Sequence, residues 1–228
     1  YSEKDFLEIS SVKPKRYEQP SKLIDVQIVA LTQINSINHK YVQWKDMQAK
    51  FEIESLIENL KVKVIVDNGL DGQRVDSYIE KLSLLRKTIN NEESLSCGLA
   101  HGDFTPWNMY INHEKLYIYD WELSKETFPV IFDLFHYIFQ SEVMINRSDY
   151  MHVKNEIERV LGLISTKQLI KQLDVDINVN FIFYLIYISS YYIDIYSEQK
   201  ELHTQAFWLF EVWDDAVSDA LDSPNGIF

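Results

Sequence analysis

Cysteine is nearly absent from this sequence, since Cys97 is the only one among 228 residues. A chain with a single cysteine forms neither an internal disulfide framework nor a cysteine-based zinc site, so we expect a reducing, cytoplasmic environment. Glycine and proline are also scarce, at 6 and 5 residues. Their scarcity argues against a turn-rich β protein and favours long helices.

Positive charge is the next shortage, because 22 lysines and arginines face 35 acidic residues and leave a net charge of −13. No basic cluster is visible. We therefore expect neither nucleic acid nor an anionic membrane surface as a partner, because both need a positive footprint. An acidic surface suits a cationic substrate, and it is also a common means of staying in solution.

Long apolar runs are missing as well. The most apolar stretch, residues 179–196, is interrupted by Asn180, Ser189, Ser190 and Asp194, so it predicts a buried core helix rather than a membrane span. The start of the chain is polar and acidic, unlike a secretory signal. It begins with Tyr1 instead of methionine, and we expect that upstream sequence has been removed.

What the chain does contain is a large apolar fraction, 46% of its residues, which is enough for a sizeable core. Apolar spacing and capping residues predict mainly helices with a few short strands. The segment 61–66 fits a strand by its alternation and a helix end by its position. The expected helices span residues 21–38, 44–60, 73–89, 129–139, 148–162, 166–173, 179–197 and 200–221, and the expected single strands span residues 5–9 and 97–100.

Polar residues of catalytic type gather in residues 99–122. Asp103 is followed by Asn108, and Asp120 comes after two short apolar runs, 109–111 and 116–119, which flank the polar residues 112–115. That pattern predicts a β-hairpin, with Asn108 entering its first strand and Asp120 leaving its second. Their oxygen atoms could then meet at one end of the hairpin. Such a pair suits Mg²⁺, which takes few protein ligands and leaves room for phosphate oxygens.

This spacing resembles the catalytic segment of the aminoglycoside phosphotransferase and choline kinase superfamily, which has a protein kinase-like fold. The resemblance implies that Asp103 is the catalytic aspartate, which accepts the proton of a substrate hydroxyl. It implies that Asn108 and Asp120 are the Mg²⁺ ligands that hold the nucleotide phosphates. Catalysis in such enzymes is mostly positioning and charge neutralisation.

Three further positions match the family. The resemblance implies that His101 braces the catalytic loop and that Asp133 ties a helix start to the same loop. Asp120-Trp121-Glu122 is similar to the Asp-Phe-Glu of choline kinase-like members, which implies Glu122 as an additional metal contact. A solvated hairpin with capping Asp and Asn residues is the alternative interpretation, and it leaves the crowding of Pro106, Trp107 and Trp121 around polar residues unexplained.

The fold implied by the resemblance is mainly α with a short catalytic β-hairpin, the C-terminal lobe of the protein kinase-like α+β fold. Residues 1–18 would be a hinge strand and linker left from the small lobe, and residues 19–228 the helical large lobe. The implied function is ATP- and Mg²⁺-dependent transfer of the γ-phosphate to a hydroxyl of a small molecule: an amino sugar, another sugar or a choline-like alcohol. Adenine contacts and the oligomeric state stay open.

The small lobe of such kinases carries a phosphate-covering loop and a lysine clamp, and neither is found here. The resemblance implies that the parent protein is a small-molecule kinase. The missing loop and lysine leave the activity of this chain alone open. A kinase-like lobe that serves as a binding or scaffold module is the alternative function. Metal-dependent phosphate hydrolysis is a third, although two-metal hydrolases usually bring more His and Asp ligands.

Two groups of residues are expected to have structural rather than functional roles. His136, His152 and His203 lack a metal-ligand partner at helical spacing, and each is expected to be a surface or capping histidine. The aromatic residues of the last helices could line a substrate pocket, although core filling is the interpretation we expect for each of them. These are Tyr184, Tyr187, Tyr191, Tyr192, Trp208 and Trp213.

Overall fold

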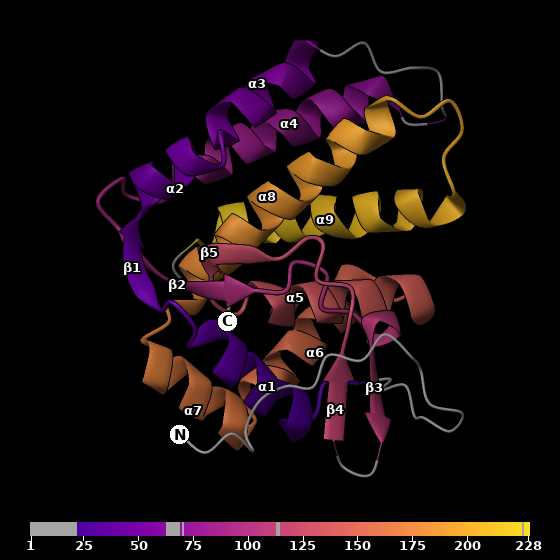
Figure 1. Ribbon diagram of the computed structural model, residues 1–228. Coiled ribbons are helices and arrows are strands. Elements are labelled where there is room, and N and C mark those ends of the chain that lie inside the picture. The colour runs from indigo at the N-terminus through magenta and orange to yellow at the C-terminus, as the bar shows by residue number, and fades with distance from the viewer. Residues whose placement is uncertain (1–21, 63–68, 70, 113–114, 225) are drawn as a thin grey trace.

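The computed structural model describes residues 22–62, 69, 71–112, 115–224 and 226–228. The expected strand at 5–9, the hinge and linker at 1–18, and the turn of the hairpin at 113–114 lie outside these residues. Helices dominate the described chain, and two small antiparallel sheets complete it (Figure 1). The prediction of a mainly helical chain with a short β-hairpin is thus confirmed.

A three-stranded antiparallel sheet lies at the centre, in the order β1-β2-β5 (Figure 1). Its strands are β1 (Lys40–Gln43), β2 (Ser94–Ala100) and β5 (Lys125–Pro129). The predicted strand at 97–100 is the end of β2, whereas β1 and β5 were not predicted. Both are short and take their pairing from β2, which no local pattern in the sequence shows.

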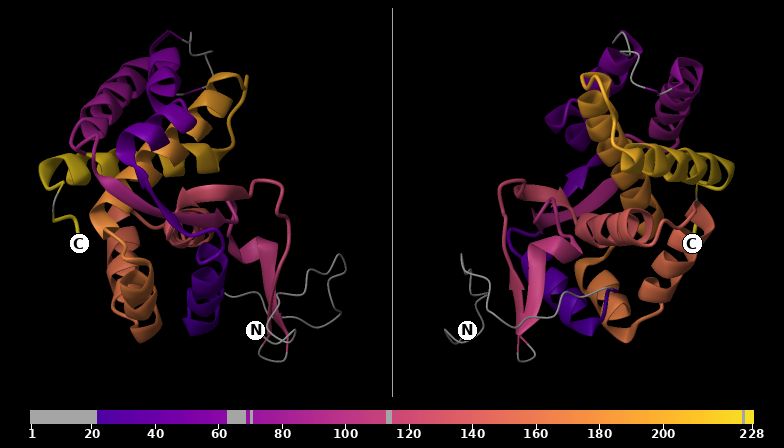
Figure 2. Two further views of the ribbon diagram at one scale, coloured as in Figure 1. Left: turned by 60° about the vertical axis from the view of Figure 1, so that its left-hand side comes forward. Right: turned by 90° about the vertical axis from the view of Figure 1, so that its right-hand side faces the viewer.

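Helices cover both sides of this sheet. One group packs together above it in Figure 1 and comprises α3 (Ile53–Val62), α4 (Gly72–Arg86), α8 (Ile177–Ser197) and α9 (Thr204–Asp222). The other group lies below it and comprises α1 (Asp25–Asn35), α6 (Tyr150–Leu161) and α7 (Ile164–Leu173). The two further views in Figure 2 show the same separation.

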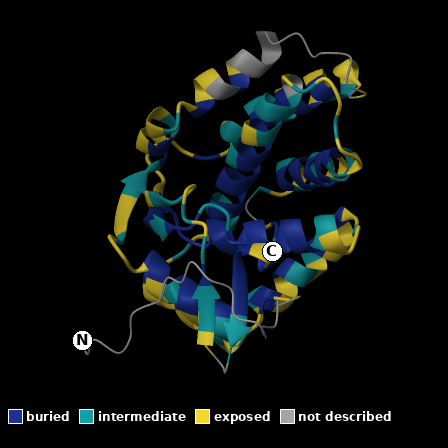
Figure 3. Cartoon of the chain, turned by 45° about the vertical axis from the view of Figure 1, so that its right-hand side comes forward, coloured by how far each residue is buried: buried dark blue, intermediate teal, exposed yellow. Residues whose placement is uncertain are grey.

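Two elements connect these groups. Helix α5 (Phe132–Phe139) is buried along its whole length and packs against both α6 and α8. Figure 3 shows buried residues, in dark blue, concentrated on the helices at the centre of the molecule. A π-helical turn, η2 (Gln140–Ile145), follows α5 directly and packs against α9. Because α5 has no exposed face, it provides a rigid support for whatever is bonded to its side chains.

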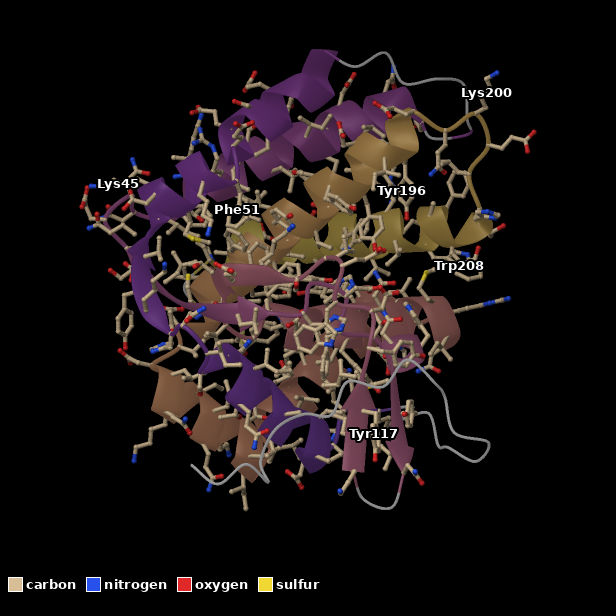
Figure 4. All side chains as sticks on the ribbon, in the orientation of Figure 1. Lys45, Phe51, Tyr117, Tyr196, Lys200 and Trp208 are labelled. Atoms are coloured by element: carbon tan, nitrogen blue, oxygen red, sulfur yellow. The ribbon has the colours of Figure 1, made fainter. Side chains whose placement is uncertain are left out.

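The predicted β-hairpin forms as expected. Strand β3 (Met109–Asn112) pairs with β4 (Lys115–Ile118), with Met109 opposite Ile118, and the short turn η1 (Pro106–Asn108) leads into it. Tyr110 and Tyr117 stack across the strands at 4.8 Å. Figure 2 shows the hairpin projecting from the body of the molecule, and Figure 4 places Tyr117 on it.

Some predicted helix boundaries were wrong. The helix expected over 44–60 is two helices, α2 (Trp44–Lys50) and α3, because Glu52 adopts a left-handed conformation with φ of 49°. The preceding Phe51 turns into the core instead, where its ring meets Phe128 at 4.9 Å. Helix α1 begins only at Asp25 and is buried on one face. Helix α8 is the predicted core helix, and no helix in the described part of the chain combines the length and apolarity that crossing a membrane requires.

Candidate active site

The loop after β2 is held by a carboxylate from α5. Asp133 is fully buried, and its two oxygens accept hydrogen bonds from the backbone N–H groups of His101, at 2.7 Å, and Gly102, at 2.9 Å. Burial raises the pKa of the Asp133 carboxyl, and the two backbone N–H donors oppose that rise. Since both oxygens accept, the bonded form is the carboxylate, and the loop is fixed to the core helix.

His101 joins this loop to the end of the hairpin. Its Nε2 donates to the backbone oxygen of Tyr119 at 3.0 Å, and its Nδ1 accepts from the N–H of Asp103 at 3.3 Å. These partners define a neutral imidazole with the proton on Nε2. The ring also packs against Trp121 at 4.6 Å. His101 is therefore a buried connection between the loop and the segment on either side of Asp120.

The Asp103 carboxylate has a donor on each oxygen. Asn108 Nδ2 donates to Oδ2 at 2.7 Å and to the backbone oxygen of Asp103 at 3.0 Å, while His136 Nε2 lies 3.2 Å from Oδ1. The side chain stays 28% exposed. Burial alone would raise the pKa of Asp103, but the hydrogen bonds from His136 and Asn108 hold it below its ordinary value. The group is thus an oriented carboxylate at neutral pH.

His136 was not predicted as part of this site, and the expectation that it is a surface or capping histidine was wrong. Its side chain is 1% exposed and faces Asp103 from α5. The sequence contained a usable signal, because Asp133 and His136 are three residues apart and so share one helix face. His152 and His203 are exposed at helix starts, as predicted.

A backbone hydrogen bond holds together the two chain segments that carry Asn108 and Asp120. The N–H of Tyr119 donates to the backbone oxygen of Asn108 at 3.0 Å, which places Asp120 one residue beyond that pair. Asp120 is exposed, and its backbone adopts the left-handed conformation with φ of 66°. Glu122 is exposed two residues later, and within the described residues no hydrogen bond joins the side chain of either acid to Asp103 or Asn108.

These donors fit the chemistry of Mg²⁺. Asn108 uses its amide nitrogen on Asp103, so its amide oxygen is the atom left to meet a cation, and Asp120, the residue after Tyr119, would add carboxylate oxygens. In the part of the chain that the structure describes, no three His, Cys, Asp or Glu side chains gather as a metal site. The donor set therefore suits a cation that is completed by ligand phosphates and water, as Mg²⁺ commonly is.

A cavity opens beside Asp103. Its volume is about 150 Å³, and it lies between the 102–103 loop, β5, α5 and the second half of α8. Tyr187, Tyr191 and Tyr192 line it, whereas Tyr184 and Trp213 fill the core as expected. Small-molecule sites are commonly cavities of this kind. A ligand in this cavity would lie against the oriented carboxylate.

No protein-family model matches this chain, and no curated protein sequence does. Among solved structures, a glucosamine kinase is similar, with a TM-score of 0.37 and 11% sequence identity. The alignment covers 90% of this chain and 51% of that chain, so this chain spans about half the length of that kinase. A similarity of this degree assigns neither a family nor an activity.

Proposed function

We propose that this chain is the catalytic lobe of an ATP- and Mg²⁺-dependent phosphotransferase that acts on a hydroxyl of a small molecule. The observation that carries the proposal is the Asp103 carboxylate, which has a donor on each oxygen and lines a cavity with mostly apolar walls. The family resemblance of residues 101–133 to the aminoglycoside phosphotransferases and choline kinases supports the same conclusion.

Asp103 would act on the substrate hydroxyl. A carboxylate with a lowered pKa is a weak base, so its main contribution is to accept a hydrogen bond from the hydroxyl and aim its oxygen at the phosphorus atom. It takes the proton as the substrate oxygen bonds to the γ-phosphorus and the bond from that phosphorus to the departing ADP oxygen breaks. This division of labour suits phosphoryl transfer, in which positioning and electrostatics supply most of the rate.

Asn108 and Asp120 would hold the Mg²⁺ ion through their side-chain oxygens, with Glu122 as an additional contact. The ion neutralises charge on the nucleotide phosphates when it is bound. Asn108 has a second task in this proposal, because the same side chain fixes Asp103. One residue thereby couples the metal position to the orientation of the base.

His101 and Asp133 would keep the loop in this geometry. Asp133 binds two successive backbone N–H groups, and His101 bridges the loop to Tyr119. Neither side chain has to exchange a proton in the reaction. Both are positioning residues, whose loss misplaces Asp103 and Asp120 together.

The test is phosphate transfer from ATP to a panel of small alcohols, measured with this chain and with any longer protein that contains it. We expect Asp103→Ala and Asp120→Ala to lose activity to a similar extent, while Asp76→Ala, on the exposed face of α4, leaves it unchanged. Chelation of Mg²⁺ should abolish the transfer. Equal rates for the wild type and Asp103→Ala would refute the proposal, and a binding or scaffold role would then replace it.

A further inference from the structure

The cavity beside Asp103 has one wall made by a single helix face. Tyr187, Ile188, Tyr191, Tyr192 and Ile195 all come from α8 and line it at the spacing of one helical stripe. Phe128 and Phe132, from β5 and α5, also line it. Most of the lining is thus aromatic or aliphatic.

The rings of this wall are held in place by their neighbours. The Tyr187 ring lies 5.0 Å from Phe128 and 5.9 Å from Phe132, in edge-to-face contacts. Tyr192 stacks on the fully buried Trp213 at 5.5 Å. Rings fixed in this way present flat apolar surfaces at little cost in side-chain entropy. Such a surface favours a ligand that has a flat face of its own.

Charge in the cavity differs from that of the whole chain. Although the net charge is −13, Asp103 and Lys125 are the charged residues among those that line the cavity. Lys125 is positioned by the pairing of β5 with β2, where it lies opposite Ala100, next to the catalytic loop. Lys81 and Lys154, by contrast, pair with Asp214 and Asp219.

Lys125 has no carboxylate partner among the described residues, so its ammonium group is available to a ligand. A cationic ligand would meet this lysine, and its favourable partner would be Asp103, which the substrate hydroxyl already occupies. An anionic ligand would gain a charge-assisted hydrogen bond from Lys125. The electrostatics therefore favour an anionic substrate over an amine.

We propose that the cavity binds an alcohol that has a flat, apolar ring and an anionic group, with the ring on the α8 tyrosines and the anion on Lys125. The placement of the hydroxyl at Asp103, and with it the preference for an anion over an amine, rests on the proposed function. The binding of the ring does not.

Three probes of one shape test this directly: para-hydroxymethyl benzoate, benzyl alcohol and para-hydroxymethyl benzylamine. They share the ring and the hydroxyl and differ in charge. Affinities are measured by ligand-observed NMR on the whole chain, without nucleotide or metal. We expect the benzoate to bind most tightly and the amine most weakly. Tighter binding of the amine than of the benzoate would overturn the proposal.

Single-residue variants show which side chains determine the affinities of the probes. Lys125→Gln should lower the affinity for the benzoate by about tenfold and leave the affinity for benzyl alcohol unchanged. Lys125→Arg should keep most of the preference for the benzoate over the amine. Lys115→Gln, at the exposed start of β4, is the matched control and should change nothing. Tyr191→Ala should weaken all three probes, because it removes part of the wall. An unchanged benzoate preference in Lys125→Gln would refute the role of Lys125.

The anion could also belong to the nucleotide, since a phosphate offers the same chemistry to Lys125. ATP affinity is therefore measured for the wild type and Lys125→Gln. If Lys125→Gln loses affinity for ATP alone, Lys125 binds the nucleotide, and the proposal that it binds an anionic substrate is overturned. A loss confined to the benzoate supports it. If the probes show the expected order but no phosphate is transferred to any alcohol, the proposed function fails while this binding site stands.

Discussion

The Asp103 carboxylate owes its orientation to two donors that come from different elements. Asn108 approaches Oδ2 from the hairpin, and His136 approaches Oδ1 from the core helix α5. The second nitrogen of His136, Nδ1, is buried without a partner in the described structure. A buried nitrogen in that setting favours the neutral imidazole with its proton on Nε2, which is the form that donates to Asp103.

His136→Phe should therefore lower kcat by about tenfold, because the lost hydrogen bond leaves Oδ1 free to turn. His136→Gln keeps an amide donor near the position of Nε2 and should recover part of the loss. Steady-state kinetics check both, with KM expected to change little. Equal kcat values for the Phe and Gln variants would show that His136 contributes packing alone.

Asp133→Asn tests how the loop is held. The replacement puts an amide N–H₂ group where the backbone N–H of His101 or Gly102 needs an acceptor, in a fully buried place. We expect a loss of about 3 kcal/mol in the free energy of unfolding, measured with urea. Asp176→Asn is the control, because Asp176 caps α8 in an exposed position and Asn caps equally well. Similar losses in both variants would contradict the bracing role of Asp133.

At the scale of elements, the end of α1 fixes β2 against the start of α5. Asn35 donates through Nδ2 to the backbone oxygen of Leu99 at 2.9 Å and accepts through Oδ1 from the N–H of Ile131 at 3.2 Å. Gly98 makes this approach possible, because a Cβ atom there would lie 1.9 Å from the backbone oxygen of Asn35. The strand that leads to the loop carrying Asp103 thus depends on a glycine.

Gly98→Ala should separate α1 from β2 and cost about 2 kcal/mol of unfolding free energy, since the obstructing atom belongs to the backbone. The catalytic loop should shift with β2, so activity should fall more than stability alone explains. Gly72→Ala is the matched control, because nothing lies within 4 Å of its added Cβ at the start of α4. Thermal unfolding measures both, and equal melting temperatures for the two variants would contradict this account.

Local patterns predicted the elements whose causes are local. The hairpin follows from apolar runs around a polar turn, and α8 follows from its apolar residues and the Asp176 cap. Strand β5 was missed because Lys125-Glu126-Thr127-Phe128-Pro129 alternates poorly and forms only by pairing with β2. The position of Lys125 was missed for the same reason. The pairing of β5 with β2 brings Lys125 to the cavity that Asp103 also lines, and no spacing in the sequence shows that pairing.

At the scale of the whole molecule, the site is assembled where the hairpin, the β2 loop and α5 meet, with α8 as the far wall of the cavity. Only some of the residues that the motif predicted are in contact. Direct hydrogen bonds link His101 to Asp133 and to Asp103, and Asp103 to Asn108. Asp120 joins them only through its neighbours Tyr119 and Trp121. Its metal-binding role is therefore the part of the proposal that most needs a measurement.

That measurement is a crystal structure of the chain grown with Mn²⁺ and a non-hydrolysable ATP analogue, with the metal located by its anomalous scattering. The account predicts a manganese ion bound to the amide oxygen of Asn108 and the carboxylate of Asp120, with a phosphate oxygen completing its coordination next to Asp103. A manganese ion and nucleotide bound elsewhere, with Asn108 and Asp120 free of metal, would contradict it.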